Sequence, residues 1–136
     1  MKPSDFRWLN AALAAAFILA LAAPLPLRVS ADGERVLAPG GGVLPELCMY
    51  KRTTGDDCMS CHLGRSVILA AHGDWQGSLQ RHRGGVILYG WTALQALTRL
   101  ALAFASAFAA RFWILDLSVS MSSLTAALGA VLFIGR

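Results

Sequence analysis

Charged residues are scarce in this chain, and their scarcity argues against a soluble protein. Only 15% of the 136 residues are charged, whereas 56% are hydrophobic. Soluble domains typically carry about 25% charged residues. The sequence also lacks a run of basic residues interleaved with aromatic residues, which nucleic-acid binding usually requires. We therefore expect an integral membrane protein that contacts lipids and does not bind nucleic acid.

A recognisable catalytic arrangement is missing as well. The few Asp, Glu and Ser residues show no spacing typical of acid–base or nucleophilic catalysis. Cys61 and His62 are adjacent in the sequence, which makes them a poor nucleophile–base pair. We therefore expect that the chain has no catalytic activity of its own.

Turn-forming residues are absent from long apolar stretches, which predicts membrane spans. Residues 8–27 form a 20-residue apolar stretch, about the length that a helix needs to cross a bilayer. No Gly or Pro occurs between Gly90 and Gly129, so the polar break that begins at Asp116 is the best turn candidate. We predict a single all-α membrane domain over residues 1–136, with about three transmembrane helices near residues 8–27, 86–110 and 117–134.

The first of these stretches has a rival interpretation as a cleaved signal peptide. Val29-Ser30-Ala31, directly before Asp32, has small residues where a signal peptidase would need them. We favour a retained anchor because the stretch is long and its end is only weakly signal-like. Lys2 and Arg7 precede it and predict a cytoplasmic N-terminus. We therefore expect a multi-pass protein of the bacterial inner membrane, with the following loop in the periplasm.

The polar loop, residues 28–85, contains all the cysteines and histidines. From residue 30 to 54 it is rich in Gly and Pro, which predicts an extended segment. The stretch 63–71 can form a short helix ended by Gly73, and Asp74 is a plausible N-cap of a second short helix. Together they predict a helical hairpin at the membrane surface. Trp75, Leu79 and His82 would share one face of the second helix.

A cluster of cysteines is the strongest chemical signal in the sequence. Cys58-Met59-Ser60-Cys61-His62 matches the Cys-x-x-Cys-His pattern, in which two thiols bond the vinyl groups of a c-type haem and the histidine binds the iron. His82 is then a candidate for the second axial position. This interpretation requires an extracytoplasmic loop and leaves Cys48 unused. We favour it over the alternatives below.

The same residues also suit a metal ion or no cofactor at all. Cys48, Cys58, Cys61 and His62 together would make a Cys₃His zinc site. His62 is an awkward fourth ligand because it adjoins Cys61. In the remaining interpretation two cysteines form a disulfide or stay as thiols.

The order of these features resembles an uncharacterised bacterial membrane family, domain of unknown function twenty-seven fifty-two. Its hallmark is a cysteine, then a Thr-Gly-x-x-Cys-Pro-x-Cys-Gly-x-x-Arg knuckle, a Gly-Asp turn, and an Asn-Pro before the next span. Residues 54–65 and His72-Gly73-Asp74 match in type and spacing. The resemblance covers roughly residues 48–85 and implies three spans arranged as in the family.

The departures from this pattern concern the candidate ligands. Met59 stands in place of the proline and His62 in place of the glycine, while His82-Arg83 replaces Asn-Pro. Two histidines gained beside retained cysteines are what a haem or metal site would require. We therefore expect a small integral membrane subunit of a larger membrane complex that holds a cofactor in its loop, with electron transfer as a possible role. The alternative is a structural or assembly subunit with zinc or with no cofactor.

Overall fold

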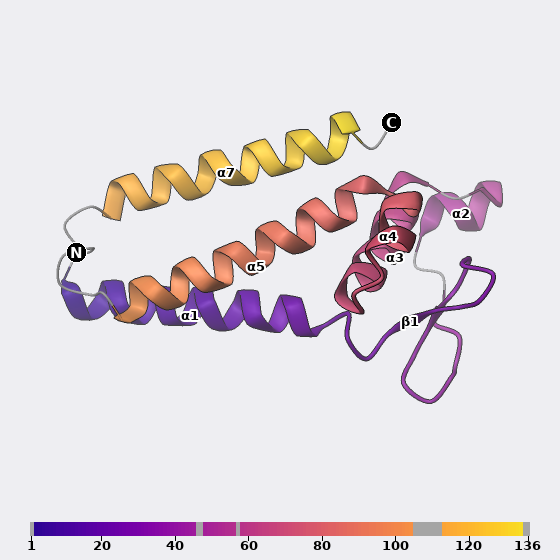
Figure 1. Ribbon diagram of the computed structural model, residues 1–136, viewed down its shortest axis with the longest axis horizontal. Helices are drawn as coiled ribbons and strands as arrows, with labels where there is room; N and C mark the ends of the chain where they lie inside the picture. The colour runs from indigo at the N-terminus through magenta and orange to yellow at the C-terminus, as the bar shows by residue number, and fades with distance from the viewer. Residues whose placement is uncertain (1, 46–47, 57, 105–112, 135–136) are drawn as a thin grey trace.

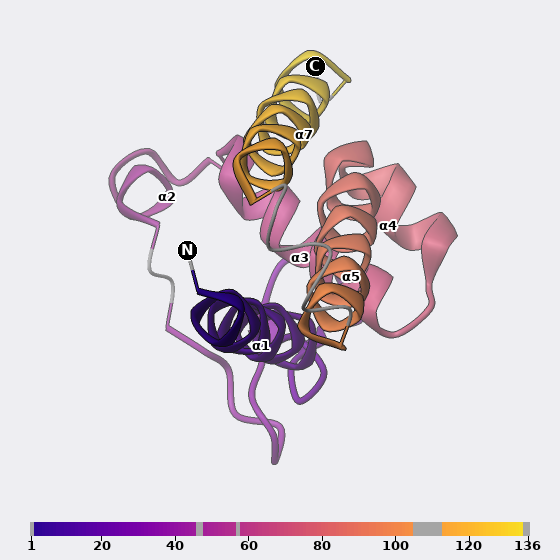
Figure 2. The same cartoon turned by 90° about the vertical axis from the view of Figure 1, so that its left-hand side faces the viewer.

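Three long helices and a cluster of short elements at one end make up the protein (Figure 1). The computed structural model describes residues 2–45, 48–56, 58–104 and 113–134. The long helices are α1 (Pro3–Ala22), α5 (Arg83–Phe104) and α7 (Trp113–Ile134). Viewed from one end in Figure 2, these three helices are seen almost along their axes. α5 packs against both α1 and α7, so it is the central helix of the three.

Two of the long helices have the length and composition of membrane spans. Ser4–Ala22 and Arg83–Phe104 are long and apolar enough to cross a membrane. The described part of α7 contains a shorter apolar helix, Ser118–Phe133, and α3 contains another, Cys61–Ala71. The expectation of a mostly helical protein with membrane-length helices is therefore confirmed. The third span over residues 117–134 stays a prediction, and part of the second predicted span, residues 105–110, lies outside the described residues.

Helix α1 differs from the predicted first span at both ends. It begins at Pro3, because proline suits the first position of a helix, where its missing N–H has no partner to lose. It ends at Ala22, five residues before the predicted boundary. Pro24 and Pro26 follow closely, and neither has a backbone N–H to continue the hydrogen bonds of the helix. The prolines therefore end the helix and do not kink it.

The segment predicted as an extended loop contains regular structure. β1 (Arg28–Val29) and β2 (Val36–Leu37) form an antiparallel hairpin, so the protein is not purely α-helical. Ser30 closes the hairpin, because its backbone N–H donates to the Arg35 carbonyl and its hydroxyl accepts from the Arg35 N–H. A short helix, α2 (Met49–Thr54), follows and ends at Gly55, whose φ is 81°. These elements shorten the loop and direct the chain back towards the long helices.

The predicted helical hairpin is present as α3 (Met59–Ala71) and α4 (Trp75–Arg81). As expected, Gly73 follows α3 with a φ of 78°, and the side chain of Asp74 caps α4 by accepting from the Gly77 N–H at 2.9 Å. Helix α3 begins four residues earlier than predicted. This earlier start places Cys61 in its first turn.

Two serines and a glycine lock this hairpin onto α5. Ser66 and Ser78 are fully buried, and each hydroxyl lies 2.8–2.9 Å from the other residue's carbonyl oxygen. Gly85, in the first turn of α5, lies so close that an added Cβ would fall 2.0 Å from the Ser66 hydroxyl. Only a glycine fits this close approach. Small residues thus let the backbones of α3 and α5 approach closely and join α3 to α4 through buried hydrogen bonds.

His82 does not share a face with Trp75 and Leu79, contrary to the prediction. Its backbone is extended, so α4 ends before it. Trp75 is 52% exposed and Leu79 is 47% exposed, whereas His82 is only 6% exposed. The His82 Nδ1 accepts a hydrogen bond from the Gly84 N–H at 3.0 Å, which turns the ring inward. The helical spacing failed here because the chain leaves the helix one residue too early.

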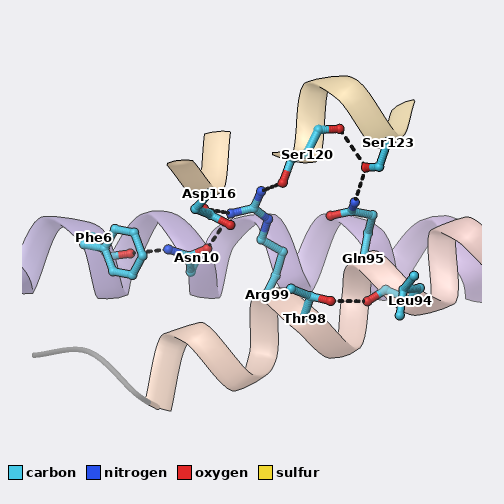
Figure 3. A network of polar contacts seen from close by, with 9 residues as sticks. All are labelled: Phe6, Asn10, Leu94, Gln95, Thr98, Arg99, Asp116, Ser120 and Ser123. Atoms are coloured by element: carbon cyan, nitrogen blue, oxygen red, sulfur yellow. Dashed lines mark hydrogen bonds and ion pairs between the residues drawn. The ribbon is translucent and has the colours of Figure 1, made fainter. Parts of the chain in front are cut away.

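A buried polar network joins the three long helices (Figure 3). Nη1 of Arg99 on α5 pairs with the Asp116 carboxylate on α7 at 2.6 Å and donates to the Asn10 side chain on α1 at 2.8 Å. Its Nη2 donates to the Ser120 hydroxyl at 2.5 Å. Arg99 is only 6% exposed. The arginine predicted to lie inside the second span is therefore paired with groups of the bundle, the commoner outcome for such a residue.

Candidate metal centre

The three cysteines come together at the start of α3. The Sγ atoms of Cys48 and Cys58 lie 3.1 Å apart, and those of Cys58 and Cys61 lie 3.2 Å apart. All three sulfurs lie within 4.8 Å of one another, and all three residues are partly buried. Cys58 is thus the central member of the cluster. The arrangement could hold a metal ion, because thiolates are strong ligands for soft and borderline metals.

Local backbone structure explains why the cysteines meet. Cys58 precedes α3 with extended backbone, and Cys61 lies one turn into the helix, with its N–H donating to the Cys58 carbonyl at 3.0 Å. Residues i and i+3 lie on the same side of a helical turn. Cys48 occupies the corresponding position before α2. The left-handed backbone of Gly55 turns the chain between them, so that both helix starts face each other.

The environment of the cluster keeps Cys61 protonated. Burial, followed by hydrogen bonding with Cys58 and Cys48, raises the pKa of the Cys61 thiol from 9.0 to about 11. Desolvation disfavours the charged thiolate, and a neighbouring thiolate would repel it. A bound cation would reverse both effects, because a coordinated thiol loses its proton. The cluster therefore exchanges protons for metal when it binds an ion.

The histidines lie apart from this cluster. Within the described residues, the group of potential ligand atoms contains the three cysteines and neither His62 nor His82. His62 lines a second cavity together with Leu69 and Arg81, whereas Cys48 and Cys61 line a different one. His82 is buried at the start of α5, near Val131 of α7. Of the predicted site residues, the structure brings together Cys48, Cys58 and Cys61.

The sulfur positions suit a shared ion better than a covalent haem. The sulfurs of Cys58 and Cys61 lie 3.2 Å apart, close enough for both to bind one ion. Cys48, which a haem would leave unused, is in contact with Cys58.

Sequence reasoning did not single out the charged residue that lies near this site. Arg65, one turn after Cys61, is only 5% exposed, and its Nη1 donates to the Gly33 carbonyl at 3.3 Å. Its position in the knuckle pattern was the only signal in the sequence. Burial of a guanidinium group could not be inferred from that pattern.

Comparison with known proteins supports the resemblance stated from the motif. Residues 48–96 match the model of a family described as "Protein of unknown function (DUF2752)". The match begins at the first cysteine of the cluster and extends into the middle of α5. No curated protein and no solved structure matches the chain. The resemblance is therefore confirmed for this segment, and it carries no assigned activity.

Proposed function

We propose that this chain is a small membrane-anchored subunit that holds a zinc ion on Cys48, Cys58 and Cys61. The observation that carries the proposal is the convergence of three sulfurs within 4.8 Å. Three thiolates form the core of many structural zinc sites. The proposal replaces the c-type haem as the favoured cofactor, because the cluster employs Cys48 and a haem does not.

The cluster needs only a small adjustment to accept zinc. With Zn–S bonds of about 2.3 Å, tetrahedral geometry separates the ligand sulfurs by about 3.8 Å. The two sulfur pairs in contact are 3.1 and 3.2 Å apart, so each must open by about 0.6–0.7 Å. Cys48 and Cys58 have extended backbone in front of their helices, where side-chain rotation meets no preceding helical turn. The required movement is therefore within reach of side-chain rotation.

The ion would tie the loop to the helical bundle. Cys48 belongs to the segment before α2, whereas Cys61 lies on α3, which packs against α5. Structural zinc contributes directly to folding because the unfolded chain lacks a preformed site. Three protein ligands leave a fourth position, which a water molecule or a group of a partner protein can fill. This role is structural and gives the chain no catalytic activity of its own.

The proposal also places the protein in the bacterial inner membrane with α1 retained as an anchor. Contacts at several levels of α1 support retention. Phe17 packs edge-on against Trp91 of α5 at 5.8 Å between ring centroids, and the Tyr89 hydroxyl donates to the Leu21 carbonyl at 3.4 Å. Asn10 contributes to the Arg99 network. A signal peptide that is cleaved off does not need specific contacts with α5. Intact-mass measurement of the mature protein tests whether α1 is retained.

Lys2 ahead of α1 favours a cytoplasmic N-terminus and therefore a periplasmic cysteine loop. An impermeant thiol reagent should reach Cys48 in intact cells after chelation and mild reduction. Labelling only after the cells are broken would invert this topology. Arg111, which we expect near the cytoplasm, lies outside the described residues.

The proposed partners are membrane lipids and helices of other subunits. Leu94, Leu97 and Phe104 of α5 are 61%, 66% and 78% exposed, so a large apolar surface of this helix faces outward. Lipid chains or partner helices must cover it. The expected complex is a larger membrane assembly in which this chain supplies the metal-bound loop.

Metal and haem analysis of the full chain, purified from membranes under reducing conditions, tests the proposed cofactor. We expect about one zinc per chain, as structural zinc sites bind one ion. Cys48→Ser should release the metal. Met49→Ser is the matched control, because Met49 adjoins Cys48 but is 73% exposed and is not a ligand. His62→Ala should keep the metal, and loss of zinc in this variant would show that His62 completes the site.

Two results would overturn the proposal. A pyridine haemochrome spectrum that survives acid–acetone extraction would establish covalent haem in place of zinc. If the protein contains neither haem nor metal, the loop is a disulfide-bonded or docking element, and mass spectrometry without reduction would then detect the disulfide.

A further inference from the structure

A cavity of about 740 Å³ lies between the cysteine cluster and the ends of two long helices. Pro24 and Leu27, just after α1, form one side, and Leu88 in the second turn of α5 forms another. Val67 and Ile68 of α3 complete the apolar wall. Because α1 and α5 have the length of membrane spans, the cavity lies where both spans meet the loop. That position corresponds to the membrane–water interface.

Charged groups of one predominant sign line the same cavity. Among the described residues, Arg35, Lys51 and Arg65 are in its wall, against one acidic residue, Glu34. Arg65 is the most deeply buried of them, at 5% exposed. Most of the remaining lining is apolar. The cavity thus combines an apolar interior with an excess of positive charge, and its volume falls within the usual range of about 300–1,000 Å³ for ligand sites.

We propose that this cavity binds one acyl chain of an anionic membrane phospholipid, whose phosphate lies against Arg35, Lys51 and Arg65. The apolar wall favours a hydrocarbon chain, because burial of each methylene is favourable. A phosphate placed beside cations in a partly buried site forms strong charge-assisted hydrogen bonds. A soluble anion would gain the second interaction but not the first. The location at the ends of two membrane-length helices gives a bilayer lipid direct access.

This inference does not depend on the metal proposal. Cys48 and Cys61 line the cavity, but the lipid contacts described above use the cations and the apolar wall. The experiment below is therefore performed both with zinc-loaded protein and after chelation. Failure of metal binding and failure of lipid binding are then separate results.

Gly64 offers a way to fill the cavity without disturbing the fold. It lies on α3 in the cavity wall, and no atom lies within 4 Å of the position that a Cβ would occupy. Gly64→Leu therefore projects a side chain into the cavity and removes volume for the acyl chain. Gly90→Leu is the matched control. Gly90 is also helical with open space around its Cβ position, but it does not line the cavity.

Photolabelling in nanodiscs of phosphatidylcholine tests the proposal. The probe is phosphatidylglycerol with a diazirine on one acyl chain, and labelled peptides are identified by mass spectrometry. We expect labelling of the peptide that contains residues 61–68 of α3. Gly64→Leu should reduce it about tenfold, because it displaces roughly two methylene groups. Gly90→Leu should leave it unchanged.

Charge selectivity tests the position of the phosphate. Lys51→Gln should lower labelling by phosphatidylglycerol relative to phosphatidylcholine about fivefold, the effect of one cation near an anionic lipid. Equal labelling of the wild type by both lipids would overturn the anionic assignment. Undiminished labelling of the Gly64→Leu variant would overturn the cavity as the site. Displacement of the probe by inorganic phosphate alone would show a site for a soluble anion and would also overturn the proposal.

Discussion

The cysteine cluster and the Arg99 network are built in opposite ways. The cysteines come from a 14-residue window and meet through one helical turn and one glycine turn. Arg99 instead contacts Asn10, which is 89 residues away in sequence, and Asp116 on a third helix. The cluster is partly exposed, whereas the arginine is almost completely buried. The chemistry of the cysteine cluster therefore depends on local geometry, whereas the Arg99 network forms only in the assembled bundle.

This difference separates what each region contributes. A cluster of cysteines can release an ion without leaving an uncompensated charge, because the thiolates take up protons in its place. A buried arginine cannot lose its partners without leaving an uncompensated charge. We therefore expect substitutions in the network to affect stability and substitutions in the cluster to affect ligand content.

Removing Arg99 should have the largest effect on stability. Arg99→Leu leaves Asp116, Asn10 and Ser120 without their common donor, so we expect a loss of roughly 3–5 kcal/mol in the free energy of unfolding. Denaturant titration in detergent measures this change. Thr98→Ala is the control, because Thr98 is exposed and, among the described residues, its hydroxyl bonds to the Leu94 carbonyl of its own helix. Equal losses in the two variants would contradict a stabilising role for the network.

Crowding the contact between the loop and α5 should cost less. Gly85→Ala places a methyl group within 2.0 Å of the Ser66 hydroxyl and 2.8 Å of its backbone carbon. Such overpacking typically costs about 1–3 kcal/mol. The Gly90→Ala control meets open space and should not destabilise the helix. Thermal unfolding in detergent distinguishes the two, and an unchanged midpoint for Gly85→Ala would show that the hairpin can separate from α5.

The cap of α4 is expected to have a smaller effect. Asp74→Ala removes the acceptor for the Gly77 N–H and should cost about 1 kcal/mol. Asp56→Ala is the control, because it removes an exposed carboxylate that lies outside the described helices. Hydrogen exchange should detect faster opening of α4 in the first variant alone. Similar exchange in both variants would mean that the cap does not stabilise this helix.

The protonation state of Cys61 should change reactivity without changing the fold. Because its pKa is raised to about 11, the thiol stays protonated at pH 9, where an ordinary thiol is half ionised. The thiolate is the reactive form, so alkylation by iodoacetamide should be slow at pH 9 and rise toward pH 11. Peptide mass mapping of metal-free, reduced protein follows the reaction. A half-maximal rate near pH 9 would contradict burial of this thiol.

The parts of the structure that sequence predicted are those that depend on local chemistry. Gly73 and Asp74 ended one helix and began the next as expected, because turn and cap preferences act over a few residues. The cysteine spacing likewise placed Cys58 and Cys61 together. Prediction failed for His82, since a single residue of extended backbone removed it from the helical face. The position of the helix boundary decided that outcome, and spacing alone does not fix a boundary.

Long-range partners could not be predicted. Arg99 falls within the predicted second span, residues 86–110, but its acceptors lie on two other helices, and no local pattern links them. The hairpin of β1 and β2 was also missed, because its strands are only two residues long. Their pairing depends on the Ser30 turn and not on an alternating apolar pattern.

The close contact between Ser66, Ser78 and Gly85 has a mechanical consequence. No long side chain lies between the backbones of α3 and α5 at this point to absorb a displacement. A displacement of the loop would therefore tilt α5 as a rigid body. Arg99 lies near the opposite end of α5, and its hydrogen bonds connect that end to α1 and α7. The loop and the far end of the bundle are thus joined by a series of direct contacts along α5.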